Sequence, residues 1–181
     1  MAAFDNIDIE IRQIQPGDRL TGLSLGDDRF TALKIFLQRH ATTYEKQSLS
    51  RTYAAFNTAE NDRIAGYVTI VCGEVVLADG DDPLVADEGL QYLYNQYPAV
   101  KIARLAVDRR VQRRGIGDAL ISLSLGIVQD FIVPNVGCRF VMVDSKRDAV
   151  AFYDRLGFTM LDTPANRERD EPVMFIDLSK L

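Results

Sequence analysis

The chain has little of what metal sites, disulfide frameworks and membrane spans are made of. Its 181 residues include no tryptophan, one histidine and two cysteines. His40, Cys72 and Cys138 lie too far apart in the sequence for the usual spacing of zinc ligands, so no metal site is expected. No run of about 18 apolar residues occurs, which excludes a membrane-spanning helix.

The N-terminal segment also lacks the basic and apolar stretches of a secretory signal. We therefore expect a cytoplasmic protein in which Cys72 and Cys138 remain reduced. Both cysteines fall in strand-like apolar runs, so we expect them in the core.

The overall composition, with 47% hydrophobic and 26% charged residues, is typical of a folded globular protein. The length suits one domain. No internal repeat, low-complexity tract or linker rich in proline and serine marks a boundary. We therefore expect residues 1–181 to form a single domain.

The charge is unevenly distributed along the chain. The formal net charge is −5, yet residues 101–117 hold six lysine and arginine side chains and one aspartate. This stretch therefore carries +5, and the rest of the chain carries −10. Such a concentration of arginines indicates either an anion-binding segment or a solvated basic loop, and charge alone does not separate the two.

Hydrophobic periodicity predicts a chain that mixes helices and strands. Alternation at period two predicts strands, and apolar spacings of three and four predict helices. The expected strands cover residues 7–14, 51–57, 63–72, 101–107, 138–143, 158–161 and 172–178, and residues 74–77 extend the third one. The expected helices cover residues 28–37, 38–47, 116–131 and 145–156, the last one opened by a capping box of Ser145 and Asp148.

The order of these elements combines a hairpin with strand–helix–strand units. It favours an α/β chain with a central mixed sheet and helices on both faces, and argues against a purely parallel doubly wound sheet. Residues 78–99 are the least regular part of the sequence. There we expect an acidic loop at residues 79–82 and a helix or apolar lid at residues 87–97.

One segment carries recognisable chemistry, where a strand ends at Val107, a basic loop follows, and a helix begins at Gly115 and Gly117. The first N–H groups of a helix lack partners inside the helix, and the helix dipole adds positive charge there. Glycines let a phosphate approach the backbone closely, and arginines add charge-assisted hydrogen bonds. The segment therefore predicts a cradle for a pyrophosphate group.

Two better-known glycine motifs do not fit this segment. A Walker loop requires lysine directly after its last glycine, where this chain has Asp118. The dinucleotide-binding fingerprint requires a third glycine, where this chain has Leu120.

Three motifs, in order, resemble those of the GNAT superfamily of N-acetyltransferases. Gln112-x-x-Gly115-x-Gly117 is similar to the superfamily's coenzyme A signature, Gln/Arg-x-x-Gly-x-Gly/Ala. Ala103-Arg-Leu-Ala-Val-Asp108 resembles its fourth strand, and Ala149-Val-Ala-Phe-Tyr153-Asp-Arg-Leu-Gly-Phe158 resembles a helix that follows. The motifs cover about residues 101–160, the cofactor-binding core. The resemblance implies the GNAT fold, with a central mixed, mostly antiparallel sheet.

The resemblance also implies an activity and a site. It implies that acetyl-CoA is the co-substrate and that its acetyl group passes directly to a primary amine, with Tyr153 protonating the departing thiolate. The implied contacts to acetyl-CoA come from Leu105, Ala106, Val107, Gln112, Arg113, Arg114, Gly115, Ile116, Gly117 and Phe152. Arg109 is a further candidate for the phosphates. Direct transfer requires an N–H donor for the oxyanion and a proton for the leaving thiolate.

The sequence departs from the superfamily at one position and leaves the general base open. Lys146 stands where many members have an asparagine that binds the pantetheine. Glu74 and Asp144 lie near strand ends that face the expected site, and an ordered water serves equally well as the base. A core position is the alternative for Tyr153, and a surface position is the alternative for Arg113 and Arg114.

The acceptor is the most open question. The layout also resembles toxin-type GNAT proteins, which acetylate the amino group of charged tRNA and pair with an antitoxin. RNA binding usually requires a basic surface, and this chain is acidic. Charge therefore favours a small amine or a peptide amine over tRNA. A non-catalytic acyl-CoA-binding domain is a further alternative, which Tyr153 disfavours. A homodimer is implied by the resemblance alone.

Overall fold

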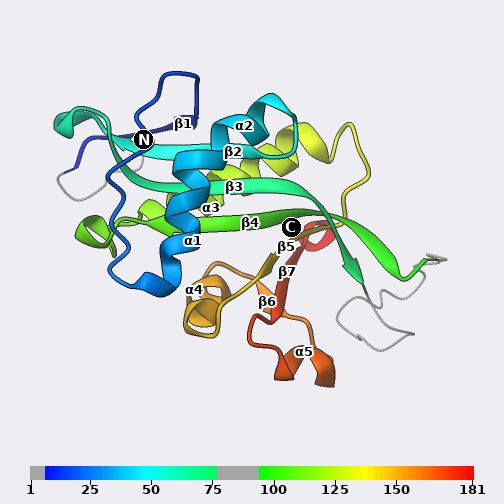
Figure 1. The fold of residues 1–181 in the computed structure, drawn as a ribbon. Coiled ribbons are helices and arrows are strands. Elements are labelled where there is room, and N and C mark those ends of the chain that lie inside the picture. Colours follow the sequence, from blue (N-terminus) through cyan, green and yellow to red (C-terminus); the bar gives the residue numbers. More distant parts are fainter. Residues whose placement is uncertain (1–6, 77–93) are drawn as a thin grey trace. The chain divides into compact units, whose positions relative to one another are not determined.

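The computed structural model describes residues 7–76 and 94–181 (Figure 1). The predicted acidic loop, and the predicted helix or lid up to residue 93, lie outside the described residues. The chain divides into two compact units. Unit 1 comprises the chain up to Val71 together with Ala103–Leu125, and unit 2 comprises Cys72–Ile102 with Gly126–Leu181. Each unit takes segments from both halves of the chain. A single domain over residues 1–181 stays a prediction.

The described residues form seven strands in the order β1-β2-β3-β4-β5-β7-β6. Their bounds are β1 Ile9–Gln13, β2 Arg51–Asn57, β3 Arg63–Val76, β4 Gln96–Val107, β5 Phe140–Asp144, β6 Thr159–Met160 and β7 Val173–Asp177. The β4–β5 pair is parallel, whereas β1–β2, β2–β3, β5–β7 and β6–β7 are antiparallel. The mixed, mostly antiparallel sheet predicted from the sequence is confirmed.

Five α-helices accompany these strands in the described parts of the chain. Their bounds are α1 Thr31–Ile35, α2 Ala41–Lys46, α3 Ile116–Ile127, α4 Val150–Arg155 and α5 Pro164–Glu168. A π-helical turn, Phe36–His40, joins α1 to α2, and a second one, Val128–Ile132, extends α3. None of these helices is long and apolar enough to cross a membrane.

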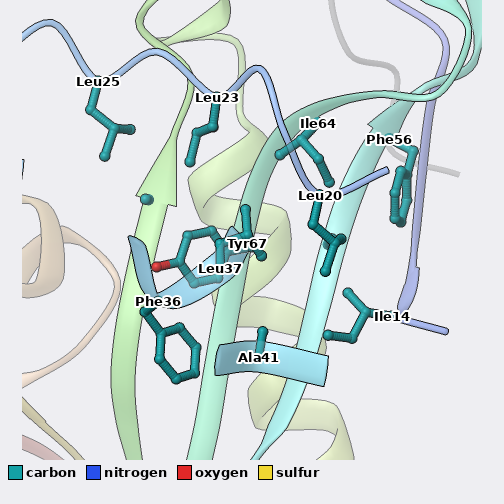
Figure 2. Close-up of a cluster of buried hydrophobic side chains, with 12 residues drawn as sticks. Ile14, Leu20, Leu23, Leu25, Phe36, Leu37, Ala41, Phe56, Ile64 and Tyr67 are labelled. Carbon is teal, nitrogen blue, oxygen red and sulfur yellow. The ribbon is translucent and has the colours of Figure 1, made fainter. Parts of the chain in front are cut away.

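Unit 1 carries helices on both faces of its strands. Two neighbouring residues of β3 contact helices on opposite faces. Successive side chains of a strand point to opposite faces. A side chain at Gly66 would meet Ile116 and Leu120 of α3, whereas the hydroxyl of Tyr67 donates to the Leu33 carbonyl of α1. The core on the α1 and α2 side gathers apolar residues from these helices, β2, β3 and the segment before α1 (Figure 2).

Unit 2 has a cluster of its own, centred on aromatic rings. Phe140 of β5 meets Tyr97 and Phe175 edge to face, with ring centroids 5.7 and 5.3 Å apart. Tyr97 belongs to β4, so the helix or lid predicted over residues 87–97 is wrong at its described end. The strand begins at Gln96, before the predicted start at Lys101, and its parallel pairing with β5 begins at Ala99.

Three further sequence predictions are wrong. Cys72 is exposed and Cys138 only half-buried, because strand-like runs do not tell which face is covered. The hydroxyl of Ser145 donates to the Lys146 carbonyl, so the expected capping box does not form. The regular helix expected over residues 116–131 ends at Ile127, where a π-helical turn begins, and Phe131 in that turn is 67% exposed.

Candidate active site

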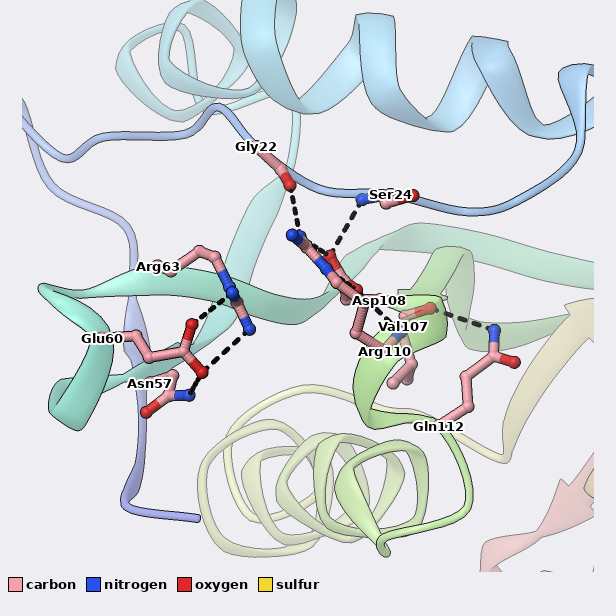
Figure 3. Close-up of polar contacts among 9 residues, drawn as sticks. All are labelled: Gly22, Ser24, Asn57, Glu60, Arg63, Val107, Asp108, Arg110 and Gln112. Atoms are coloured by element: carbon pink, nitrogen blue, oxygen red, sulfur yellow. Dashed lines mark hydrogen bonds and ion pairs between the residues drawn. The ribbon is translucent and has the colours of Figure 1, made fainter.

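The end of β4 and the loop that follows it form a well-connected corner of unit 1. The Asp108 amide donates to the Ala65 carbonyl of β3 at 2.8 Å, which holds the strand end against its neighbour. Gln112 Nε2 donates to the Val107 carbonyl at 3.2 Å (Figure 3). A Cβ at Gly66 would lie only 2.9 Å from the Ala106 carbonyl oxygen, so this close approach of β3 and β4 requires glycine.

Asp108 is the anchor of this corner. Its side chain is fully buried and accepts hydrogen bonds from the Ser24 amide at 2.9 Å and from the Arg110 amide and Nε at 2.9 and 2.8 Å. Arg110 Nη2 completes the pair with Asp108 Oδ2 at 2.5 Å and donates to the Gly22 carbonyl at 2.8 Å (Figure 3). One carboxylate thus fixes the loop and ties it to residues 22–24.

We expect this anchoring to weaken in acid. Burial by itself raises the pKa of Asp108, but the hydrogen bonds from Arg110 and Ser24 outweigh it, so the pKa lies below the ordinary value of 3.8. The pKa values of Asp18 and Asp177 are lowered as well, through Arg12 and Arg139.

A group with a lowered folded-state pKa stabilises the fold above its unfolded pKa and loses that effect as the pH falls through the folded pKa. The free energy of unfolding should therefore be nearly constant from about pH 7 to 5 and fall below about pH 4. Urea midpoints measured across this range test the expectation, and an unchanged midpoint at about pH 3 would contradict it.

The loop after this anchor is open to an anion. Gln112, Arg113, Arg114 and Gly115 are all exposed, and α3 begins directly after them at Ile116. Arg113 has φ +62° and Gly115 has φ +78°. Apart from the neighbouring residues in the chain, no atom of the described residues lies within 4 Å of the position that a Cβ at Gly115 would take. Exposed arginines and an open glycine directly before a helix start offer an anion positive charge and room to approach the backbone. The residues therefore fit the diphosphate of coenzyme A.

A polar hollow of about 290 Å³ lies on unit 1 beside this loop. Arg114 lines it from the loop, and Arg63 and Glu60 line it from the β2–β3 hairpin. Glu60 Oε1 accepts from Arg63 Nη2 at 3.1 Å and from Asn57 Nδ2 at 2.8 Å (Figure 3). Glu60 and Arg63 are therefore already paired with each other.

Tyr153 and Phe152 lie on α4 of unit 2. The Tyr153 side chain is buried, with its ring edge to face against Phe152 at 5.1 Å and Phe158 at 5.3 Å. Burial raises the pKa of the phenol above its ordinary value of 10, so the hydroxyl keeps its proton across the physiological range. Such a group holds a proton that it can donate and is not available as a base.

The two carboxylates named as candidate bases differ in their surroundings within unit 2. Asp144, at the end of β5, forms ion pairs with Lys101 and, at 3.3 Å, with Arg169. Both carboxylate oxygens of Asp144 are therefore already engaged by cations. Glu74 is exposed on β3. Lys146, at the position that departs from the superfamily, pairs with Glu171 at 3.1 Å.

The structure thus distributes the predicted site residues over both units. Leu105, Ala106, Val107 and the segment Gln112–Gly117 lie together in unit 1, and Phe152 and Tyr153 lie together in unit 2. The roles assigned to them stay predictions. The described residues contain no group of three or more His, Cys, Asp or Glu side chains suited to a metal ion.

Sequence reasoning missed the anchoring role of Asp108 and Arg110. The signal that was present is local, because an aspartate directly before a helical turn commonly caps it, and Asp108 caps the turn Arg109–Val111 in this way. The bonds to Gly22 and Ser24 join residues more than 80 positions apart and have no such local signal.

Comparison with known proteins places these features in context. The family model of the acetyltransferase (GNAT) domain matches residues 25–171. A protein of Mycobacterium tuberculosis (strain ATCC 25618 / H37Rv) named tRNA-acetylating toxin is 29% identical over 154 residues, which cover 84% of this chain and 85% of that protein.

Two solved structures share the fold at low sequence identity. AtaT complexed with acetyl-methionyl-tRNAfMet has a TM-score of 0.79 and 22% identity, with 96% of both chains covered. A mutant AtaT toxin bound to the C-terminus of the antitoxin AtaR and acetyl-CoA has a TM-score of 0.73 and 22% identity, covering 96% of this chain and 95% of that one. At this identity the likeness shows the fold alone.

Proposed function

Because this chain belongs to the GNAT family of acetyltransferases, whose co-substrate is acetyl-CoA, we propose that its acceptor is an aminoacyl-tRNA. The acetyl group would pass to the α-amino group of the amino acid that the tRNA carries. The observation that carries this proposal is the likeness to the tRNA-acetylating toxin over 84% of the chain. The AtaT complex with acetyl-methionyl-tRNAfMet supports it through the shared fold.

The proposal departs from the acceptor that charge alone favours. A net charge of −5 favours a small cationic amine, and the comparisons give that acceptor no support. Arg109, Arg113 and Arg114 of this stretch are exposed and place basic side chains at the surface that the net charge conceals. An acidic protein can therefore still hold a short stretch of RNA.

Each group of residues would have a separate role in the proposed reaction, and its surroundings suit it to that role. The open loop Gln112–Gly117 would hold the diphosphate, and the backbone at Leu105–Val107 would hold the pantetheine and polarise the acetyl carbonyl. Acetyl-CoA supplies the activated thioester. Tyr153, kept protonated by burial, would donate its proton to the leaving thiolate, while the attacking amine loses a proton to water. The proton released to water balances the one that Tyr153 takes back from solvent before the next cycle.

We infer that an antitoxin is the protein partner of this chain. The support is the AtaT structure, in which a toxin of the same fold is bound to the C-terminus of its antitoxin. A partner that covers the site would account for how a cell tolerates an enzyme that consumes charged tRNA.

The test of the proposed acceptor uses radiolabelled acetyl-CoA and purified charged tRNA. We expect label in tRNA that carries an amino acid and none in the same tRNA after deacylation, because the uncharged 3′ end offers no α-amine. Mild base should release the label as an N-acetyl amino acid. Polyamines and a lysine-containing peptide serve as competing acceptors in parallel reactions.

Label that appears in the polyamine or the peptide, with charged tRNA unlabelled, would overturn the tRNA proposal while leaving the family assignment in place. Binding of acetyl-CoA without transfer to any acceptor would favour the non-catalytic alternative.

A further inference from the structure

Three arginines of unit 1 lie over aromatic rings, and two of them have a carboxylate partner. Arg12 pairs with Asp18 at 2.8 Å, and Arg29 pairs with Asp27 at 3.1 Å. Arg104 is half-buried in β4 and has neither an ion pair nor a hydrogen bond to the part of the chain that the structure describes. Burying part of a cation without a counter-charge costs free energy, unless a bound ligand supplies the opposite charge.

The position of Arg104 is nevertheless well defined by packing. Its guanidinium carbon lies 3.7 Å from the centroid of the Phe36 ring, the shortest of these stacking distances. Phe36 is itself fixed, stacked on Tyr67 at 6.4 Å and edge to face with Tyr44 at 5.5 Å. The hydroxyl of Tyr67 is anchored to the Leu33 carbonyl at 2.8 Å.

The helix that supplies Phe36 is irregular at this point. A π-helical turn begins at Phe36 and separates α1 from α2. Such turns interrupt the regular hydrogen bonding of a helix and are frequent at functional sites. Phe36 and Leu37 are both buried in the turn. The turn places the Phe36 ring against β4, where the Arg104 guanidinium stacks on it.

Arg104 directly precedes Leu105–Val107, the segment proposed to hold the acetyl group. Ala106, two residues further along β4, belongs to the same cluster as Phe36, so Arg104 and Ala106 face the α1 and α2 side of the strand. A guanidinium stacked on a ring keeps its N–H donors at the edge of the plane, where they match two oxygens of a phosphate.

We propose that Arg104 binds a backbone phosphate of the terminal nucleotides of the acceptor RNA and so orients the aminoacyl end toward Leu105–Val107. The inference rests on the proposed function and assigns one contact within it. Arg104 acts as a specificity-determining residue, because it distinguishes an acceptor that carries phosphates from a bare amine.

The test leaves the protein unchanged in its first arm. Two aminoacylated CCA trinucleotides are compared, one with ordinary phosphates and one with neutral methylphosphonate linkages of nearly the same shape. We expect kcat/KM to be on the order of 10-fold or more higher for the charged acceptor, since a hydrogen bond to a charged group is stronger than a neutral one. Equal values for the two acceptors would overturn the proposal.

The second arm uses Arg104→Gln, Arg104→Lys and Arg29→Gln. We expect Arg104→Gln to abolish the preference for the charged trinucleotide while the KM for acetyl-CoA stays unchanged. Arg104→Lys should restore part of the preference, because it keeps the charge but loses the planar fork. Arg29→Gln removes a stacked but exposed and ion-paired arginine and should leave the preference intact.

The outcomes separate this inference from the function on which it rests. If Arg104→Gln kept the full preference, or lost activity equally with both trinucleotides, the phosphate contact would be disproved while tRNA remained the acceptor. If the wild-type protein acetylated neither the trinucleotides nor charged tRNA, the proposed function would fall. Inhibition by an acidic peptide with no response to the phosphates would point to a protein partner at Arg104 and overturn the RNA contact.

Discussion

Substitution Tyr153→Phe should lower kcat for acetyl transfer by roughly 100-fold or more, the usual contribution of a positioned general acid. The KM for acetyl-CoA should change little, because the substitution removes one hydroxyl and keeps the ring. Packing should also survive, since the ring contacts with Phe152 and Phe158 are edge-to-face contacts that phenylalanine reproduces. Steady-state kinetics with both substrates varied gives the two constants separately.

The matched control is Tyr53→Phe, which removes a hydroxyl from a half-buried tyrosine of β2 in unit 1. We expect kcat to remain at the wild-type value in that variant. A fully active Tyr153→Phe enzyme would show that the thiolate leaves without this proton and that Tyr153 is a packing residue.

Substitution Asp108→Asn should lower the free energy of unfolding by about 2–4 kcal/mol. The carboxylate is fully buried and accepts four hydrogen bonds from Ser24 and Arg110. An amide offers one oxygen only, and its NH₂ group would face a donor on the other side. Urea unfolding of the two proteins measures the difference.

Asp108→Asn should also raise the KM for acetyl-CoA, because the same hydrogen bonds fix the loop that leads to Gln112–Gly117. Asp62→Asn is the control, since Asp62 is an exposed aspartate with φ +54° on the β2–β3 hairpin of the same unit, and asparagine tolerates that conformation. An Asp108→Asn protein as stable as the control would mean that Arg110 and Ser24 find equivalent partners in water.

The elements predicted well from the sequence are those whose signal is local. Residues 51–57 were predicted as a strand and form β2 with the same bounds, since Thr52, Tyr53 and Phe56 favour strands and a turn follows. The helix beginning at Ile116 was found because its apolar residues repeat at three and four positions after two glycines.

The elements that were missed depend on distant partners. The short helix α5 has no long apolar repeat, and it is held by Asn166, whose side chain bonds the carbonyls of Leu161 and Val173 and the amide of Val173. Cys72 is exposed because burial of a strand face depends on what packs over it, which the run of apolar residues does not state.

The candidate site likewise has features with a local signal in the sequence and features that depend on distant contacts. Its motifs and the co-substrate they imply were contained in the sequence, because a phosphate cradle requires glycines and basic residues at fixed spacing next to a helix start. Only the tertiary structure revealed that Asp108 anchors that cradle through Ser24 and that Arg104 is stacked on Phe36 with no ion-pair partner among the described residues. Both contacts join segments more than 60 residues apart, and burial and pairing at such distances arise only when the chain is folded.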